Sequence, residues 1–352
     1  MTTRWLPLAF CAVFATTGAA QTNRFVLKGD SVAVYNLVGE LRVEPGSASD
    51  VAVEVTRSGT DAAQLDVQSG PLRGYETLRV IYPSDVISLP DWGRGWNTTL
   101  RVRDDGTFGD DGRWRRDGRE VRITGRAGGR GGLDASANLR VTVPAGRRVW
   151  LHWGVGKVFV TNVDGVIVVQ AASADVSAER TRGTLKLDTG SGEISARDAS
   201  GDVTLESGSG DITATNLHGG VIKLETGSGN ITLTGAEATR LGIETGSGEI
   251  TVTGAKGDHL AFETGSGSVD VALTAAFQNL AIETGSGDVT LRVPPTIGAE
   301  VDLDTGSGEF DLGGLTMQVR RLQEDHISGT IGDGRGKLSI ETGSGNVRLV
   351  KI

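Results

Sequence analysis

The chain has 352 residues, of which 53 are glycine, 8 are proline and one is cysteine, and its formal net charge is -9. The hydrophobic fraction of 38% is enough for a thin, extended core but low for a globular enzyme of this length. Residues 151–352 are acidic and residues 83–150 are basic, and an acidic main region disfavours nucleic acid as the partner.

The first 20 residues predict a secretory signal peptide. Arg4 supplies a positive charge, residues 5–15 form an apolar run too short to span a bilayer, and residues 18–20 form a small-residue cleavage site. The single cysteine, Cys11, lies in this segment, so we expect the mature chain to have no disulfide. Because no later segment is apolar for about 18 residues, we expect no transmembrane segment. The protein is therefore expected to be exported, to the periplasm, the cell surface or the medium.

Residues 21–82 predict a β region. Apolar and polar residues alternate from Val32 to Val43 and from Val51 to Val55, which is typical of half-buried strands. The residues Val38-Gly39-Glu40-Leu41 look like a degenerate (worn) copy of a turn motif that recurs further along the chain. We therefore expect this region to continue or to cap the repeat domain that follows.

Residues 83–139 interrupt this pattern with an irregular insertion that is rich in arginine, glycine and tryptophan. Its aromatic residues are Trp92, Trp96, Phe108 and Trp114, and residues 104–112 form an acidic turn. Two interpretations fit. Tryptophan and arginine are favoured contact residues, so the insertion could bind a ligand. Alternatively it is a flexible insertion or a cap on the repeat domain, which the nearby Trp150 and Trp153 would also suit.

Residues 140–352 repeat a Glu-Thr-Gly-Ser-Gly motif. Clean copies begin at Glu225, Glu244, Glu263, Glu283 and Glu341, and close variants begin at Asp188, Glu206 and Asp304. The first glycines of successive copies are 18, 19, 19, 19, 20, 21 and 37 residues apart. Degenerate copies at residues 153–157 and 171–175 extend the array, and we expect a worn copy near residues 325–330 to fill the last interval.

Each unit reads as a strand, a Gly-Ser-Gly turn, a second strand and a variable connection. Ile222 and Leu224 share one face before the turn, and Ile231 and Leu233 share one face after it. We therefore predict an all-β fold, a parallel β-solenoid of coils of about 19 residues. An antiparallel meander, in which each unit is a hairpin, is the alternative. We expect the glycines to supply the positive φ of a sharp corner.

The repeat resembles the bacterial "putative adhesin" family of unknown function, whose exported members carry Glu-Thr-Gly-Ser-Gly-Asp-Val repeats. The resemblance covers residues 140–352, and residues 31–83 look like the N-terminal part of the family. It implies a β-solenoid, and it brings no catalytic residues.

Stacked coils would form two acidic columns, one on each side of the turn. The column before the turn comprises Asp188, Glu206, Glu225, Glu244, Glu263, Glu283, Asp304 and Glu341. The column after the turn comprises Glu193, Asp211, Asn230, Glu249, Ser268, Asp288, Glu309 and Asn346. Oxygen ligands at such spacing would suit Ca²⁺. The alternative is a solvated edge that keeps the stack soluble, which the interruptions at Asn230, Ser268 and Asn346 favour.

Catalysis has little support in the sequence. The four histidines, His152, His218, His259 and His326, form no metal-binding pair, and we interpret His218 and His259 as surface residues of variable connections. The serine of each Gly-Ser-Gly recurs too often to be a unique nucleophile. We therefore predict no enzyme activity and identify no catalytic, cofactor-binding or metal-ligating residue, with Ca²⁺ as the one cation that the acidic columns would suit.

The favoured function is that of a non-enzymatic exported repeat protein, with a structural or adhesin-like surface that binds an envelope glycan or a protein partner. The alternative is a periplasmic accessory or sensory module of an envelope-stress pathway. A β-helix enzyme that acts on polysaccharides is a third possibility, since such enzymes use clustered carboxylates.

Overall fold

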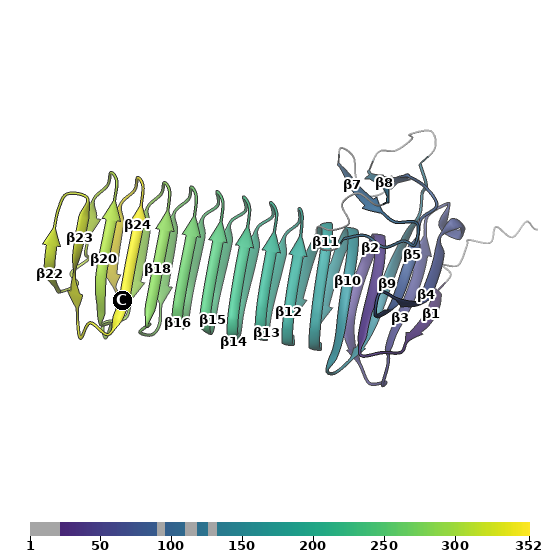
Figure 1. Ribbon diagram of the computed structural model, residues 1–352, viewed down its shortest axis with the longest axis horizontal. Coiled ribbons are helices and arrows are strands. Elements are labelled where there is room, and N and C mark those ends of the chain that lie inside the picture. The colour runs from purple at the N-terminus through teal and green to yellow at the C-terminus, as the bar shows by residue number, and fades with distance from the viewer. Residues whose placement is uncertain (1–21, 90–95, 110–117, 126–131) are drawn as a thin grey trace, which may run out of the picture.

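The computed structural model describes residues 22–89, 96–109, 118–125 and 132–352. The predicted signal peptide with Cys11 lies outside the described residues, as do Trp92 and Trp114 of the insertion. Figure 1 shows one long stack of strands, with the N-terminal region at one end and a hairpin at the other. No helix within the described ranges is both long and apolar enough for a membrane span.

The stack is a parallel β-solenoid. Glu206 pairs with Glu225, and Glu225 pairs with Glu244, so residues one repeat apart lie directly above one another. This register confirms the predicted fold class. The strands of the regular coils are β10 (Arg147–Thr161), β11 (Asp164–Glu179), β12 (Arg182–Thr189), β13 (Ile194–Ser207), β14 (Ile212–Thr226), β15 (Ile231–Thr245), β16 (Ile250–Thr264), β17 (Val269–Leu273), β18 (Asn279–Thr284) and β19 (Val289–Val293).

The core is a thin layer of aliphatic side chains between the strands before and after each turn. In β16, Ile250, Val252, Leu260 and Phe262 are buried while their neighbours face outward. The parallel register places equivalent positions of successive coils side by side, so that Ile243 lies beside Phe262. Burying each such side chain stabilises the fold by about 1.5–3 kcal/mol. The coils therefore depend on their neighbours for most of their stability.

The glycines of the turns are required for a reason other than the expected one. Their φ angles lie outside the left-handed region. Instead, successive turns stack so closely that a Cβ on Gly210 would lie 1.9 Å from the carbonyl oxygen of Gly192. A Cβ on Gly229 would lie 2.2 Å from the carbonyl oxygen of Gly210. Close backbone approach, rather than positive φ, excludes side chains here, and the prediction of positive φ was wrong.

The threonine of each motif ties its turn to the preceding coil. Buried Thr226 donates a hydrogen bond from Oγ1 to the carbonyl oxygen of Gly210 at 2.9 Å, and its Oγ1 accepts one from the backbone N–H of Gly229 at 3.3 Å. Thr245 repeats the arrangement one coil further along. The hydroxyl thus satisfies two backbone groups that the turn would otherwise leave unpaired.

A second corner lies opposite the turns and does require the left-handed conformation. The residues at this corner have φ between 53° and 74° in six successive coils. They are Asn162, Arg180, Asp198, Asn216, Gly235 and Gly254. Asparagine, aspartate and glycine tolerate this conformation best, which explains why they dominate these positions.

The C-terminal segment is inserted within the stack. Strand β24 (Gly336–Thr342) pairs in parallel with both β18 and β20 (Ala299–Thr305). Strand β25 (Val347–Lys351) likewise lies between β19 and β21 (Phe310–Asp311). Figure 1 shows β24, in yellow, between β18 and β20. The last coil of the sequence is therefore the penultimate coil in space.

The 37-residue interval between the last two motif copies holds a hairpin, so the expected worn copy near residues 325–330 was wrong. Strand β22 (Met317–Leu322) pairs antiparallel with β23 (His326–Ile331). Strand β23 in turn pairs antiparallel with β20 and covers the end of the stack. Antiparallel pairing needs only a short turn, whereas another coil would have needed a second corner.

The N-terminal region joins the other end of the stack. Strand β2 (Ser31–Gly46) pairs in parallel with β10, and Gly39 lies opposite Gly156, so the worn turn at Val38 to Leu41 belongs to a coil. Beyond β2 lie strands with antiparallel pairings and one 3₁₀-helix. They are β1 (Thr22–Leu27), β3 (Val51–Ser58), η1 (Ala62–Gln64), β4 (Asp66–Leu72), β5 (Tyr75–Ile81) and β9 (Ser136–Pro144).

The described part of the insertion forms a separate three-stranded sheet. Its strands are β6 (Val86–Ser88), β7 (Asn97–Val102) and β8 (Arg119–Thr124). Phe108 is buried and its ring approaches the ring of Tyr35 edge-on at 6.0 Å. Trp153 belongs to the core of the stack, where its indole N–H donates to the carbonyl oxygen of Gly39 at 3.0 Å.

Candidate binding groove

One outer face of the solenoid carries a groove of about 830 Å³ that runs along the stack, across β14, β15, β16, β18, β24 and β20. Side chains two residues apart on a strand share a face, so three outward columns cross these strands. We call them the polar wall (Arg240, His259, Asn279 and Lys337), the floor (Gly242, Ala261, Ala281 and Ser339) and the acidic row, which is the column predicted before the turn.

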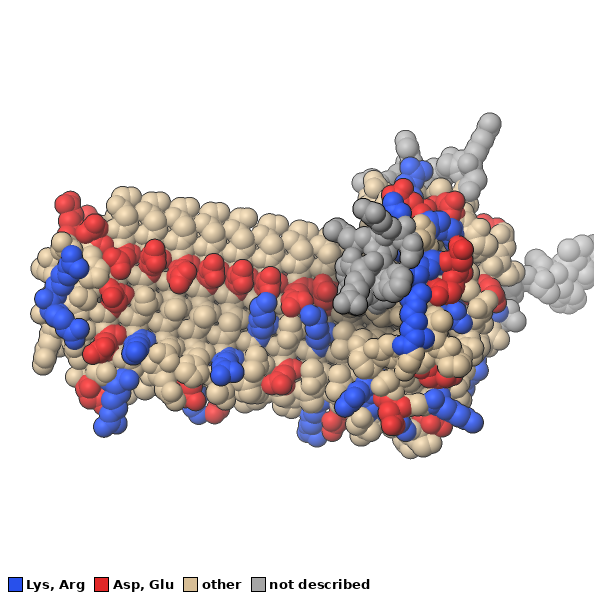
Figure 2. All heavy atoms as spheres, viewed as in Figure 1, with Lys and Arg blue, Asp and Glu red and all other residues tan. Residues whose placement is uncertain are grey.

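The acidic row is continuous. Asp188 pairs with Glu206 at one end, and Glu341 pairs with Asp304 at the other, with five register pairs of the same kind between them. Figure 2 shows it as a line of red side chains along the stack. The predicted stacking of these residues is thus present, with Glu341 placed before Asp304 because β24 is inserted.

Lysines partner two members of the row, Glu206 and Glu225. Lys186 Nζ lies 2.9 Å from a carboxylate oxygen of Glu206, and Lys223 Nζ contacts the carboxylate of Glu225. The hydrogen bond to Glu225 raises the pKa of Lys223. Burial, and then the neighbouring Glu206, raise the pKa of Asp188. The row therefore repels itself, and a nearby ammonium group relieves that repulsion.

The next four carboxylates lack such a partner. Within the described part of the chain, no basic side chain forms an ion pair with Glu244, Glu263, Glu283 or Glu341. The cause lies in the floor, where Gly242, Ala261, Ala281 and Ser339 occupy the column that holds Lys186 and Lys223 in earlier coils. These short side chains leave both the hollow and the unpaired charges.

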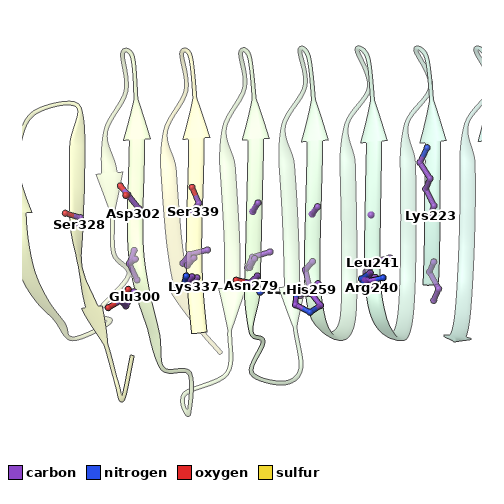
Figure 3. A pocket seen from close by; sticks show the side chains of 18 of the residues that line it. Lys223, Arg240, Leu241, His259, Asn279, Glu300, Asp302, Ser328, Lys337 and Ser339 are labelled. Atoms are coloured by element: carbon purple, nitrogen blue, oxygen red, sulfur yellow. Dashed lines mark hydrogen bonds between the residues drawn. The ribbon is translucent and has the colours of Figure 1, made fainter. Parts of the chain in front are cut away.

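The polar wall faces the acidic row across the floor. Asn279 Nδ2 lies 2.9 Å from Nδ1 of His259, which fixes the ring of this histidine. Arg240 and Lys337 stand at either end of that pair, and among the described residues neither has an ion-pair partner. Figure 3 shows the four side chains in one row across the strands, with Lys223, Ser339 and Asp302 in a second row.

The far end of the groove is lined by the charged residues Glu300, Asp302 and Arg320, and Arg320 lies 3.8 Å from a carboxylate oxygen of Glu300. Asp302 continues the floor column, and Nδ1 of His326 lies 2.8 Å from Asp304 and 3.4 Å from Asp302. The carboxylate oxygens of Asp302 and Asp304 and the ring nitrogen of His326 that could bind a metal ion lie within 4.8 Å of one another. His326 belongs to β23, so the hairpin that covers the end of the stack also brings a basic side chain to the last carboxylate of the acidic row.

The second predicted column serves the backbone. The side-chain oxygen of Asp211 accepts a hydrogen bond from the backbone N–H of Asn230 at 2.7 Å, and that of Asp288 accepts one from Asn346 at 2.8 Å. The side-chain oxygen of Asn230 accepts one from Glu249 at 2.9 Å. Asparagine and aspartate offer the same acceptor, which explains the interruptions that the sequence shows. In Asp211, Asn230, Asp288 and Asn346, a side-chain oxygen thus links neighbouring coils.

The remaining predicted features lie apart from the groove, with one exception. His259 is in strand β16 on the polar wall, so its assignment to a variable connection was wrong. His218 is exposed but also lies within a strand, β14, so its assignment to a variable connection was wrong too. His152 is buried beside Tyr35. In the acidic turn of the insertion, Asp105 accepts hydrogen bonds from Thr107 and pairs with Arg73, and these contacts hold its pKa below the usual range against the opposing effect of burial.

The floor and the polar wall were missed in the sequence. Their signal was present, because they lie two and four residues before the glutamate of each motif copy. Read down the repeat, the floor column holds Lys186, Thr204 and Lys223 and then Gly242, Ala261 and Ala281. Which residues of these columns lie side by side depends on the strand register, since Ser339 neighbours Ala281 only because β24 is inserted.

Two solved structures are similar to the chain over most of its length. A "putative adhesin" from Parabacteroides distasonis ATCC 8503 has 12% identity and a TM-score of 0.43, over 95% of this chain and 98% of the other. A "putative cell adhesion protein" from Clostridium sporogenes ATCC 15579 has 9% identity and a TM-score of 0.22, over 95% of this chain and 100% of the other. Among curated proteins, none matches this chain.

The family model described as Toastrack DUF4097 matches residues 134–350, which is well over half of the chain. The matched region holds every coil from β10 onward, including the groove and the inserted C-terminal strands. The chain therefore belongs to the Toastrack DUF4097 family.

Proposed function

We propose that this protein is an exported, non-enzymatic scaffold that binds a linear glycan of the cell envelope in the groove. The observation that carries the proposal is the direction of the groove. It runs along the stack, so each coil presents the same three columns at intervals of about 4.8 Å. A repeating surface of this kind suits a repeating ligand, and the length of one sugar unit is close to one such interval.

The chemistry of the groove supports a sugar chain. The floor offers the hydroxyl of Ser339, and the wall offers the amide of Asn279 and the ring of His259. The carboxylates of the acidic row are hydrogen-bond acceptors for sugar hydroxyls. The row repeats one carboxylate per coil without distinguishing any pair as acid and base, which supports binding rather than hydrolysis. Export rests on the N-terminal sequence.

The test is binding of envelope glycan fragments to the mature chain, measured by isothermal titration calorimetry. The variant Ala261→Trp fills the groove at its centre, and we expect it to abolish binding. The matched control is Thr251→Trp, which places the same ring on an exposed position of β16 outside the groove. Binding that survives Ala261→Trp, or that is lost equally in both variants, contradicts the proposal.

A further inference from the structure

We propose that the groove selects a linear glycan with free amino groups, and that its ammonium groups pair with Glu244, Glu263, Glu283 and Glu341. This inference rests on the proposed function and specifies the chemical class of the ligand. It starts from a difference between neighbouring coils, in that Glu206 and Glu225 form ion pairs with lysines and, among the described residues, the next four carboxylates of the acidic row do not.

Lys186 and Lys223 show the arrangement that the groove lacks. Both lysines occupy the floor column, and both bring Nζ to a carboxylate of the acidic row. In the next four coils the same column holds Gly242, Ala261, Ala281 and Ser339. An amino group of a ligand lying on this floor would occupy the position that Lys223 Nζ takes beside Glu225. The ion pair of Lys223 with Glu225 is thus a model, within the protein, for the proposed contact between a ligand ammonium group and a carboxylate of the acidic row.

The polar wall gives the ligand a direction. Arg240 and Lys337 are cationic, so they repel an ammonium group and favour placing it on the opposite side, at the acidic row. Between them, Asn279 and His259 offer hydrogen-bonding groups for sugar hydroxyls. Amino groups on one edge of the ligand and hydroxyls on the other match the two sides of the groove.

The width of the floor favours a sugar over a thinner cation. The polar wall and the acidic row are four residues apart on each strand, about 13 Å between Cα atoms. A polyamine has no groups that reach the polar wall while its amines contact the carboxylates. A pyranose ring spans more of this width and carries hydroxyls on both edges. We therefore infer an aminoglycan, and treat polyamine and oligolysine as competing outcomes of the test.

The experiment compares a hexasaccharide of glucosamine with the same hexasaccharide in N-acetylated form. Calorimetry is done with the mature chain in mildly acidic buffer, in which the amino groups of the glucosamine units are positively charged. We expect the amine form to bind roughly tenfold or more tightly than the acetylated form, because each exposed ion pair adds a small increment. The difference should shrink as salt is added.

Two sets of variants test whether the amino groups of the ligand lie on the floor beside the acidic row. Ala261→Lys with Ala281→Lys places ammonium groups beside Glu263 and Glu283, as Lys223 does beside Glu225, and should abolish the preference for the amine form. The control, Thr232→Lys with Thr251→Lys, adds the same charge to exposed positions elsewhere on β15 and β16 and should keep it. Lys223→Ala lengthens the empty floor by one coil, and should strengthen binding of the amine form.

The outcomes separate this inference from the proposed function. Equal binding of both hexasaccharides, with loss in Ala261→Trp, overturns amine selection but leaves a glycan groove. No binding of either form contradicts both for this glycan class. Binding of spermine or oligolysine as tight as that of the glucosamine hexasaccharide overturns the inference, as does a preference that persists in the Ala261→Lys, Ala281→Lys variant. Unchanged thermal unfolding in these variants would show that the stack remains folded.

Discussion

The side-chain oxygen of Asn230 accepts a hydrogen bond from the backbone N–H of Glu249, one coil further along the stack, at 2.9 Å. Asn230 also donates its own backbone N–H to the side chain of Asp211 at 2.7 Å. It is therefore one link in a chain of hydrogen bonds that runs along the edge of the stack. Such a link depends on an acceptor oxygen and not on charge, which separates it from the acidic row.

Replacing Asn230 should reveal this role. Asn230→Ala removes the acceptor for the Glu249 N–H, and we expect a loss of about 1 kcal/mol in the free energy of unfolding. Asn230→Asp keeps the oxygen and should change stability far less. Urea denaturation of the two variants measures the difference. Equal losses in both would show that the hydrogen bond contributes nothing.

Thr226→Val should destabilise the stack more than its small change in shape suggests. The variant leaves the half-buried carbonyl of Gly210 and the buried N–H of Gly229 without their partner, which costs about 1–3 kcal/mol. Thr226→Ser retains the hydroxyl, as Ser207 does one coil earlier, and should lose much less. Chemical denaturation compares the two. A serine variant as unstable as the valine variant would mean that packing of the methyl group, rather than the hydroxyl, matters.

Gly210→Ala should be strongly destabilising, because its Cβ would lie 1.9 Å from the carbonyl oxygen of Gly192. Forcing the two coils apart costs about 1–3 kcal/mol or more. Gly242→Ala is the matched control, since nothing lies within 4 Å of the Cβ it would add. Because alanine restricts the unfolded chain, this variant should be neutral or more stable by about 0.4–1 kcal/mol. The midpoint of thermal unfolding distinguishes the pair, and similar midpoints would contradict the role of close stacking.

His152 should make stability depend on pH. It stacks on Tyr35 at 4.3 Å, and burial, followed by the charge of Arg103, lowers its pKa to about 4. In the unfolded chain its pKa is about 6.5, so the unfolded state binds the proton more tightly. The stabilisation is complete above about pH 6.5 and is lost as the pH falls toward 4, by roughly 2–4 kcal/mol.

The check on His152 is urea denaturation over this pH range for the native chain and for His152→Phe. The phenylalanine variant keeps an aromatic ring against Tyr35 but has no proton to bind. We expect its stability to vary less over this range. A profile that is unchanged by the substitution would assign the pH dependence to other groups.

The repeat could be predicted from the sequence because its cause is local. Every coil must pass the same close contact at its turn, so the glycines at positions such as 210 and 229 recur at fixed spacing. The reason for them could not be predicted, because it depends on the carbonyl of another coil. The position of β24 in the stack could not be predicted either. The Glu-Thr-Gly-Ser-Gly motif at Glu341 is identical to the one at Glu283, so it does not indicate which strands lie beside it.

The groove was hidden for a related reason. Gly242, Ala261 and Ala281 are unremarkable strand residues when read singly, and they become a floor only where their columns align. Their importance also depends on the reach of Lys186 and Lys223, which fill the same column in earlier coils. Sequence reasoning found the acidic row because its residues are part of the motif, and it overlooked the columns that give some of these carboxylates an open side.

The insertion of β24 and β25 also governs the order in which the molecule can be completed. Since these strands follow β20 and β21 in the chain, the coil formed by β20 and β21 cannot join the stack through β24 and β25 until those later strands have been synthesised. A chain that stops before Gly336 would lack an internal layer and not an outer one. Loss of residues 336–351 would thus split the column, leaving the end hairpin detached from the coils that precede it.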